Sequence, residues 1–502
     1  MKSLIGLLHS QVTNHPARVA VIDGDRRYSF QDLWESIQTI ARLISAHSEE
    51  SKPPHVAIWL DNGVDYITCY YAAMLAGAVV IPLNTQNKWH QIKPILINSE
   101  VTLAFTDSKR RNKEAANLTK LAVSWFTVEE VEESIADTAS FNLDSALAKR
   151  ASATQALATI IYTSGTTGSP KGVMLSAANL AANTLSIIEY LRLRCDDIGI
   201  AVLPFFYSYG NSVLHTHLAV GASLVIENQF LYPQKVLEKM QAYQVTGFSA
   251  VPAMYATLLE RLDLNRFPFP ALRYATVAGG AIRGEHLRQI LDTWSDVEFF
   301  NMYGQTEATA RLTYHPTLNA RQKLDSIGIP IPGCDLSIRD DTGAQLADED
   351  EGEICARGPN VMLGYWKDSE ATAAKMHGDW LRTGDIGHRD SEGYFYIYGR
   401  NSDMIKSGAH RIAPEEIEEV IGMIPGVKES AVCGYPDKLL GEVIIAFVVV
   451  NDSTLAVRTI MQRCNQCLPK YKLPKKIEFV ASLPRTASGK LQRYKLLQAR
   501  ET

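Results

Sequence analysis

The feature that most constrains the fold is a strand, helix, strand pattern that occurs three times. Residues 55–60 (HVAIWL) form an apolar run, residues 65–77 have a helical composition, and residues 78–83 (AVVIPL) form a second apolar run. The same order recurs over residues 157–204 and 222–251. Repeated units of this kind predict a parallel sheet wrapped by helices, with ligands bound outside the carboxyl ends of the strands.

Other segments predict smaller elements around this core. Residues 19–30 alternate about an Asp-Gly turn, which predicts a hairpin, and Ser29 predicts a capped helix that runs to Ile44. After residue 325, short strands and Gly-rich turns predict a β subdomain. We therefore expect an α/β fold: a large N-terminal region of parallel sheets wrapped by helices plus this β subdomain, over 1–399, and a small mobile α+β C-terminal domain, 400–502.

Composition excludes several classes of protein. A chain of 502 residues with 46% hydrophobic and 21% charged residues is typical of a globular protein with more than one core. The apolar run after Lys2 is shorter than a signal-peptide core, and the longest run, 443–450, predicts a buried strand and not a membrane span. Seven scattered cysteines, with one isolated CxxC at Cys464 and Cys467, predict a cytoplasmic setting without a disulfide framework or metal site.

The charge of the chain is unevenly distributed. The net charge of −5 argues against general nucleic-acid binding. Nine Lys or Arg and two Glu lie between Lys470 and Thr502, which gives this tail a charge of +7. The tail is either a solvated helical segment or a basic lid that closes over a phosphorylated ligand.

One Gly-rich loop follows a buried run directly. Residues 163–171 (TSGTTGSPK) offer unobstructed backbone amides and hydroxyl donors, which together cradle phosphate oxygens, and Lys171 adds a point charge. The loop is not a Walker A motif, because Gly168 and Lys171 are not adjacent and no Ser or Thr follows the lysine. Most Gly-rich loops, taken singly, are plain flexible turns.

Four further stretches change this interpretation: NMYGQTE (301–307), LRTGD (381–385), GRNSDMIKSGAHRIAPEEIE (400–419) and PRTASGKLQR (484–493). Together with the Gly-rich loop and in this order, they closely resemble the motif series of the AMP-forming adenylating enzymes. That superfamily comprises acyl-CoA synthetases, peptide-synthetase adenylation domains and luciferase. The resemblance runs from about residue 15 to 496.

The resemblance implies a two-step reaction. A carboxylate attacks the α-phosphorus of ATP, pyrophosphate leaves, and the thiol of CoA or phosphopantetheine then displaces AMP from the acyl adenylate. The first step is an in-line phosphoryl transfer, which is catalysed mostly by positioning and charge neutralisation. We therefore expect ATP and Mg²⁺ as cofactors, a small carboxylic acid as substrate and no nucleic-acid partner or transmembrane segment.

Roles for individual residues follow from the same resemblance. Glu307 would bind Mg²⁺, Thr306 would touch the α-phosphate, and Lys490 would span the substrate carboxylate and the α-phosphate oxygens. Asp385 and Arg400 would bind the ribose. Thr163, Ser164, Gly165, Thr166, Thr167, Gly168 and Lys171 would hold the outer phosphates, and Gly280, Ala281, Asn301, Met302, Tyr303 and Gly304 would form the adenine pocket.

The stretch that would bind the acid is PFFYSYGNS, residues 204–212. Members that activate amino acids usually carry an Asp where this chain has Ser208, so the substrate is expected to be an acyl or aryl acid without an α-ammonium group. Arg311 would either receive a polar group of the substrate or point to solvent or a structural partner. The other acid-pocket residues implied are Tyr207, Tyr209, Ser249, Thr276, Ala278 and Ala310.

The second step would need the small domain to rotate about Ser402, where family members usually have Asp or Lys. The thiol would pass Gly408 and Ala409, and the second of these positions is usually glycine. Two other functions stay open: a stand-alone enzyme that adenylates an acid or amino acid for a biosynthetic acyl carrier protein, and a non-catalytic nucleotide-binding protein.

Overall fold

The computed structural model contains two compact units. The first comprises Met1–Leu336 and Ala356–Leu381, and the second comprises Ser337–Cys355 and Arg382–Thr502. The predicted boundary at 399/400 lies within the second unit's part of the chain and stays a prediction. The structure describes residues 3–48, 53–134, 142–163, 170–282, 284–315, 322–400, 403–407, 410–437, 441–451, 455–485 and 491–498.

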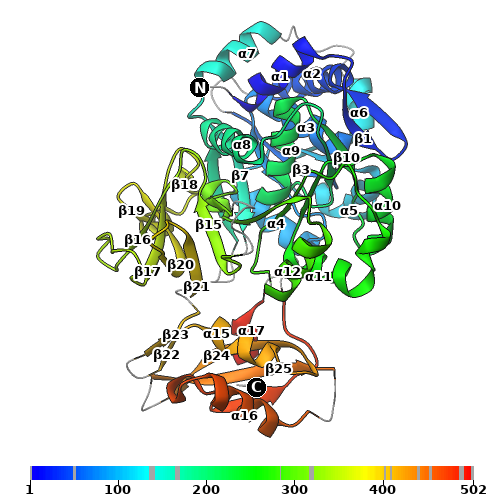
Figure 1. Cartoon of the computed structure of the whole chain (residues 1–502). Helices are drawn as coiled ribbons and strands as arrows, with labels where there is room; N and C mark the ends of the chain where they lie inside the picture. The colour runs from blue at the N-terminus through cyan, green and yellow to red at the C-terminus, as the bar shows by residue number, and fades with distance from the viewer. Residues whose placement is uncertain are drawn as a thin grey trace. The chain divides into compact units, whose positions relative to one another are not determined.

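One sheet of the first unit has the strand order β18-β8-β7-β4-β3-β5-β6. Figure 1 labels its strands β3, β7 and β18. Strands β3 to β7 are parallel, whereas β8 is antiparallel to β7 and to β18. The strands are β3 His55–Trp59, β4 Val79–Pro82, β5 Leu103–Thr106, β6 Ser124–Phe126, β7 Leu157–Thr163, β8 Lys171–Ser176 and β18 Gly364–Tyr365.

The other sheet of the first unit has the order β15-β14-β13-β12-β11-β9-β10-β1-β2. Its strands run parallel from β13 to β1, and antiparallel pairs flank this parallel series at both ends. The strands are β1 Val19–Asp23, β2 Arg26–Ser29, β9 Ile198–Ala201, β10 Ser223–Ile226, β11 Gly247–Ala250, β12 Tyr274–Val277, β13 Glu298–Tyr303, β14 Thr313–Tyr314 and β15 Ser326–Pro330.

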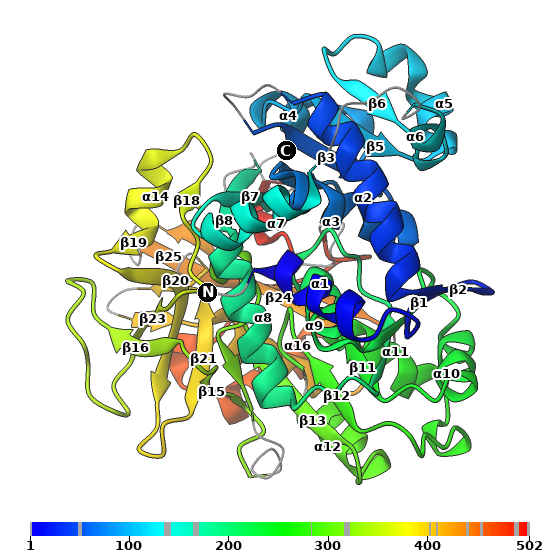
Figure 2. The same cartoon turned by 90° about the horizontal axis from the view of Figure 1, so that it is seen from above.

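Helices cover these two sheets, and α2 packs against α3 while α8 packs against α9 (Figure 2). The first unit's helices are α1 Leu4–Asn14, α2 Phe30–Ala46, α3 Val64–Ala76, α4 Trp89–Asn98, α5 Ser108–Leu118, α6 Val128–Ser134, α7 Leu143–Ser152, α8 Ala177–Leu191, α9 Ser208–Val220, α10 Pro233–Ala242, α11 Pro252–Arg261, α12 Gly284–Thr293 and α14 Ser369–Lys375. Helix α3 is buried on nearly all sides, which matches its apolar composition.

Local sequence signals account for several of these elements. The predicted hairpin is confirmed, since β1 and β2 pair antiparallel with Asp23 opposite Arg26. The predicted cap is also confirmed: the Ser29 hydroxyl accepts from the Asp32 amide, and the Asp32 carboxylate accepts from Ser29. The first predicted strand, helix, strand unit is the parallel pair β3 and β4 joined by α3.

The prediction for residues 157–204 was wrong in one respect. Strand β7 lies in the seven-stranded sheet, whereas β9 lies in the other sheet, and β8 intervenes as an antiparallel neighbour of β7. The chain therefore leaves one sheet through β8 and α8 and enters the second at β9. The third predicted unit has parallel strands, but β9 separates β10 from β11.

The second unit contains most of a small sheet and a complete α+β layer. The small sheet has the order β16-β17-β20-β21, with β16 Asp335–Arg339, β17 Gly352–Arg357, β20 Trp380–Arg389 and β21 Phe395–Arg400; β19 Met376–His377 pairs with β20. The predicted buried strand at 443–450 is confirmed in β25, whose Ile444 and Val448 lie in the core. The layer consists of β22 Ile405–Ser407, β23 His410–Ile412, β24 Val427–Asp437, β25 Gly441–Val450, β26 Lys476–Phe479, α15 Pro414–Gly422, α16 Val457–Cys467 and α17 Arg493–Gln498.

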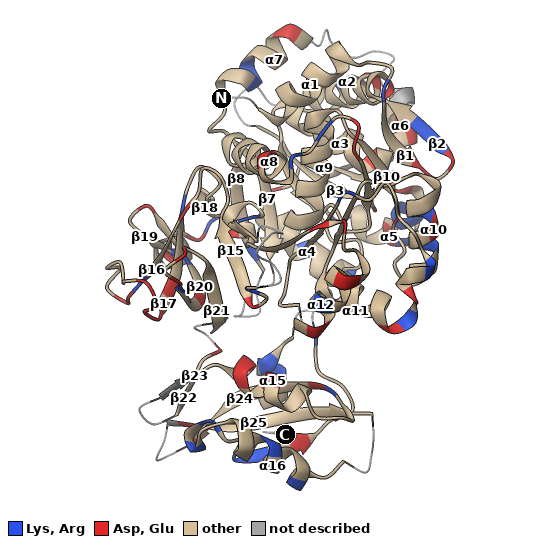
Figure 3. Cartoon of the chain, in the orientation of Figure 1, with Lys and Arg blue, Asp and Glu red and all other residues tan. Residues whose placement is uncertain are grey.

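Figure 3 marks Lys and Arg in blue and Asp and Glu in red. Several basic residues of the C-terminal tail form ion pairs inside the second unit. Arg493, for example, contacts the carboxylates of Asp403 and Glu418 at 3.0 and 2.9 Å. These pairs favour a structural role for much of the tail's positive charge. Other cations of the described tail that form ion pairs include Lys472, Lys475, Lys476 and Arg485. Across the described ranges, no helix has the length and apolar character needed to cross a bilayer.

Candidate active site

Strands β7 and β8 bring the two ends of the Gly-rich loop together. Thr163 lies opposite Lys171 in the antiparallel pair, and its hydroxyl donates to the Lys171 carbonyl oxygen at 3.5 Å. The pairing continues through Tyr162 and Gly172, so both ends of the loop are fixed by a sheet. The predicted phosphate-binding positions Ser164, Gly165, Thr166, Thr167 and Gly168 lie outside the described residues.

A tyrosine that the sequence did not indicate connects Lys171 with Glu307. The Tyr365 hydroxyl donates to the Glu307 carboxylate at 2.8 Å, and the Lys171 ammonium lies 5.2 Å from the centre of the Tyr365 ring. Tyr365 is buried and belongs to β18, which pairs with β8. The structure thus brings together the cation at the end of the loop and the predicted metal-binding carboxylate.

The chain makes a tight turn after Glu307. Thr309 has φ 67° and ψ −56°, and the Ala310 amide donates to the Ala308 carbonyl at 2.7 Å. This is the γ-turn with positive φ, which is rare and strained for a non-glycine residue. Asn360 holds the turn in place, because its carbonyl accepts from the Thr309 hydroxyl at 2.7 Å and its side chain donates to the Arg311 carbonyl at 3.0 Å.

Gly304 allows this turn to fold back on its strand. A Cβ atom at Gly304 would lie 2.0 Å from the Ala310 carbonyl oxygen, so any larger residue would displace the backbone. The close packing of the turn therefore requires glycine at position 304, in addition to the predicted place of this residue in the nucleotide pocket.

The predicted adenine-binding residues lie at the carboxyl ends of two adjacent parallel strands. Val277 of β12 pairs with Asn301 of β13, so the exposed Gly280 and Ala281 follow β12 at the edge where β13 ends. The Asn301 side-chain amide donates to the Ser326 carbonyl at 3.1 Å, which leaves its oxygen to accept a hydrogen bond.

Met302 and Tyr303 alternate along β13. The Met302 sulfur accepts from the Tyr190 hydroxyl at 3.0 Å and from Arg311 Nε at 3.4 Å, and the side chain is buried. Because successive side chains of a strand point to opposite faces, Met302 faces this interior cluster, whereas Asn301 and Tyr303 face the other side.

A chain of hydroxyl groups lies where the acid pocket is predicted. The Tyr209 and Thr276 hydroxyls are 2.7 Å apart, and the Thr276 hydroxyl donates to Ser249 at 2.9 Å. Since a hydroxyl has one proton, Tyr209 donates to Thr276 and Ser249 keeps its own proton for another acceptor. Ala278 and Ala310 are buried as well.

Ser208 is the predicted acid-pocket residue that lies next to the predicted phosphate site. The Ser208 and Thr306 hydroxyls are 3.4 Å apart, which joins the beginning of α9 to the YGQTE segment. Tyr207 precedes α9, and its hydroxyl accepts from the Asn84 amide at 3.1 Å. The structure therefore places residues predicted for the acid beside residues predicted for the α-phosphate.

Arg311 does not point to solvent. Only 3% of its surface is exposed, and its guanidinium lies 4.0 Å from the centre of the Tyr209 ring. Burial raises the pKa of Tyr209, and the positive charge of Arg311 opposes that rise.

The two residues predicted to bind ribose form an ion pair in the second unit. Asp385 of β20 and Arg400 of β21 are cross-strand neighbours, and Arg400 Nε lies 2.7 Å from the Asp385 carboxylate. Asp385 is buried. The predicted catalytic residue Lys490 and the predicted hinge and channel residues Ser402, Gly408 and Ala409 lie outside the described residues.

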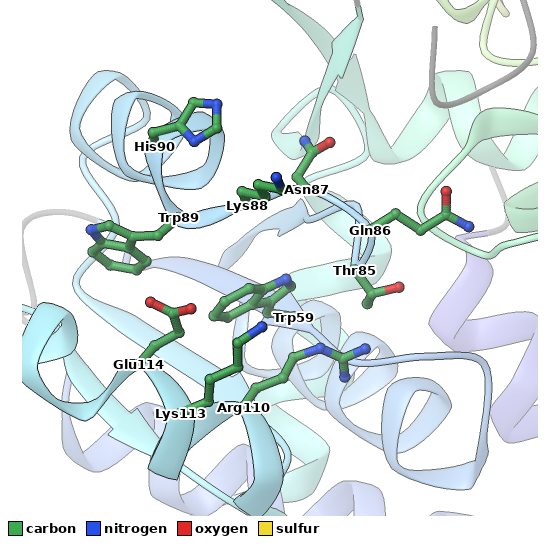
Figure 4. A pocket seen from close by; sticks show the side chains of 10 residues that line it. All are labelled: Trp59, Thr85, Gln86, Asn87, Lys88, Trp89, His90, Arg110, Lys113 and Glu114. Carbon is green, nitrogen blue, oxygen red and sulfur yellow. The ribbon is translucent and has the colours of Figure 1, made fainter.

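A separate cavity of about 620 Å³ lies at the carboxyl ends of β3, β4 and β5 (Figure 4). Arg110, one of its basic residues, is already paired with the carboxylates of Asp61 and Asp107. The residues that line it do not include any of those predicted to bind ATP, the acid or the thiol. They are Trp59, Thr85, Gln86, Asn87, Lys88, Trp89, His90, Arg110, Lys113 and Glu114.

Comparison with known proteins confirms the resemblance. The family model of AMP-binding enzymes matches residues 8–366, and the model of the AMP-binding enzyme C-terminal domain matches residues 416–490. The chain is 32% identical over 499 residues to the 2-succinylbenzoate–CoA ligase of Bacillus cereus strain AH820, covering 99% of each protein.

Solved structures give the same result. The o-succinylbenzoate CoA synthetase of Bacillus subtilis, in complex with its acyl-adenylate intermediate, matches with a TM-score of 0.87 and 31% identity over 98% of this chain and 97% of that one. The same enzyme in complex with ATP and magnesium ion matches with a TM-score of 0.87 and 31% identity, covering 98% and 99% of the two chains. These full-length matches show that the chain belongs to the AMP-binding enzyme family and is an AMP-forming acid–thiol ligase.

Proposed function

We propose that this enzyme uses ATP and Mg²⁺ to adenylate an aromatic carboxylic acid, with 2-succinylbenzoate as the first candidate, and transfers the acyl group to CoA. The observation that carries the proposal is the likeness to 2-succinylbenzoate–CoA ligases over 99% of both chains. The hydroxyl chain of Tyr209, Thr276 and Ser249 supports it, because an oxygen-bearing aromatic acid can accept the proton left on Ser249.

Thr163, Lys171 and the loop between them would hold the outer phosphates of ATP, while Thr306 contacts the α-phosphate. The 3.4 Å separation of Ser208 and Thr306 supports this placement, since the attacking carboxylate must reach the α-phosphorus in line with the leaving pyrophosphate. Lys490 would neutralise the negative charge that builds on the α-phosphate oxygens in the transition state.

Glu307 fits a Mg²⁺ site of the kind found beside nucleotides. The described ranges contain no group of three His, Cys, Asp or Glu side chains that could hold a metal. Mg²⁺ is commonly bound by one or two carboxylates together with substrate phosphates and water, so a single well-held carboxylate suffices. Tyr365 fixes one Glu307 oxygen and leaves the other available.

Asn301 would accept from the adenine amino group through its side-chain oxygen, and Gly280, Ala281, Gly304 and Tyr303 would enclose the ring. Asp385 would accept from the ribose hydroxyls, with Arg400 beside it. Met302 would contribute its backbone only, because its side chain faces Arg311 and Tyr190.

We propose CoA, and not an acyl carrier protein, as the acceptor, because the full-length relatives are CoA ligases. Rotation about Ser402 would bring Gly408 and Ala409 to the thiol channel for the second step.

Pyrophosphate release and CoA consumption, measured separately with a panel of acids, test the proposed function. We expect both rates to be highest with an aromatic acid and to require ATP and Mg²⁺. A preference for an α-amino acid over the matching deamino acid would contradict the assignment of the pocket. Transfer to a pantetheinylated carrier protein in preference to free CoA would contradict the proposed acceptor.

Changing Ser208 to Asp is expected to lower kcat/KM for the acid by about 100-fold. The new carboxylate would lie beside Thr306 and must stay charged without a partner or take up a proton, and either is unfavourable in a partly buried site. Ser208→Asn is the matched control, because the Asn side chain has the shape of Asp without its charge. Its kcat/KM for the acid should fall by less than about tenfold. Equal losses in both variants would show that size, and not charge, matters at this position.

A further inference from the structure

Arg311 is a buried cation that lacks an anionic partner in the described part of the chain. Its Nε donates to the Met302 sulfur at 3.4 Å, and its Nη1 donates to the Ala310 carbonyl at 3.5 Å. No carboxylate of the described residues lies within 4.0 Å of its nitrogens. A guanidinium has five N–H donors, and these two contacts are a weak acceptor and a long hydrogen bond. The side chain also interacts with the hydroxyl of Tyr190, which is a neutral partner and not an anion.

This arrangement is unfavourable for the free protein. A guanidinium that is only 3% exposed has lost most of its hydration, and buried charges are normally paired with an anion. The Tyr209 ring, 4.0 Å from the guanidinium, stabilises the charge only in part. Such an incomplete set of partners is typical of a group that is completed by a bound ligand.

The backbone places Arg311 at the predicted acid pocket with some strain. The γ-turn at Thr309 separates it from Thr306 and Glu307, and Asn360 locks that turn. Asn183 also holds the Arg311 carbonyl, at 3.1 Å. The aromatic ring beneath the guanidinium is Tyr209, the first member of the hydroxyl chain that ends at Ser249.

We propose that Arg311 binds a second carboxylate of the substrate, the one that is not adenylated, and thereby selects dicarboxylic acids. The inference rests on the proposed function, in which 2-succinylbenzoate has one carboxylate on the ring and one on the side chain. One carboxylate is activated at Thr306, and the other enters the interior as an anion that needs a cation. A planar guanidinium suits it, because it can donate two parallel N–H bonds to one carboxylate.

The test compares 2-succinylbenzoate with two analogues that each keep one carboxylate, 4-oxo-4-phenylbutanoate and 2-butanoylbenzoate. The wild-type enzyme is expected to have a kcat/KM for the dicarboxylic acid at least about 100-fold above that for either analogue, because the analogue leaves the buried cation unpaired. In Arg311→Met this preference should fall to within about threefold, with the KM for ATP unchanged. Arg311→Lys should restore part of the preference, since it keeps the charge without the planar fork.

Thermal melting provides a readout that a structural role would not give. If Arg311 is held ready for a ligand, ligand-free Arg311→Met should melt at or above the wild-type temperature, because an unpaired buried charge has been removed. The dicarboxylic acid should raise the melting temperature of the wild-type enzyme and not that of the variant. A variant that melts several degrees lower and keeps the acid preference would show that Arg311 is structural.

The results separate this inference from the proposed function. Activity with aromatic acids that does not depend on a second carboxylate would overturn the role of Arg311 and leave the proposed function intact. A strong preference for aliphatic dicarboxylic acids that is lost in Arg311→Met would support Arg311 and overturn the aromatic substrate. Activity confined to aliphatic monocarboxylic acids would overturn both.

Discussion

Replacing Lys490 with Ala is expected to slow acyl-adenylate formation by about 100- to 1,000-fold, the usual cost of removing one preorganised charge partner from a transition state. Thioester formation from supplied acyl adenylate should remain largely intact. The reason is that the proposed contact of Lys490 with the α-phosphate is needed only while pyrophosphate leaves. Pyrophosphate release with acid and ATP, and thioester formation with acyl adenylate and CoA, measure the two half-reactions separately.

Lys476→Ala is the matched control for this variant. Lys476 belongs to the same unit, its side chain is 55% exposed, and it pairs with Glu478 at the surface, so both half-reactions should stay within a few-fold of wild type. Loss of both half-reactions together in Lys490→Ala would contradict the assignment of this lysine to the first step alone.

Local sequence signals predicted part of the fold correctly. The wrong predictions concern which strands lie side by side in a sheet. The hairpin at β1 and β2 and the cap of α2 depend on residues a few positions apart, so the sequence contains all the information they need. The segments that became β7 and β9 are both short apolar runs next to a helix, yet they belong to different sheets. Hydrophobic periodicity indicates that a run is buried, and it does not state which strand lies beside it.

The same limit applies to the candidate site. Motif resemblance indicated Lys171, Thr306 and Glu307, but Tyr365 reaches this group only because the two-residue strand β18 pairs with β8, far earlier in the chain. The environment of Arg311 depends on the strained turn at Thr309 and on Asn360, which is also distant in sequence. Because charged residues are mostly exposed, a sequence alone predicts that a charged residue next to a motif is exposed to solvent. Only the tertiary contacts show that Arg311 is buried.

Changing Glu307 to Gln is expected to lower the rate of pyrophosphate release by at least about 100-fold at a Mg²⁺ concentration that saturates the wild-type enzyme. The amide keeps the shape and the hydrogen-bonding capacity of the side chain but removes the negative charge that a hard divalent cation requires. Titration of the reaction with Mg²⁺ should show a higher half-saturating concentration in the variant, together with a lower maximal rate.

Tyr365→Phe separates the metal role of Glu307 from its packing. This variant keeps the ring beside Lys171 and removes only the hydroxyl that donates to Glu307, so the carboxylate retains its charge. One hydrogen bond to a charged group contributes about 1.5–3 kcal/mol, of which the partly exposed Glu307 carboxylate regains part from water, so we expect a loss of roughly tenfold or less. If Glu307→Gln and Tyr365→Phe lose the same fraction of the rate of pyrophosphate release, and the Mg²⁺ dependence is unchanged in both, the metal binds elsewhere. Glu307 would then act by holding β18 against the YGQTE turn, through the bond from Tyr365 and the contact of its own carbonyl with the Met362 amide at 2.9 Å.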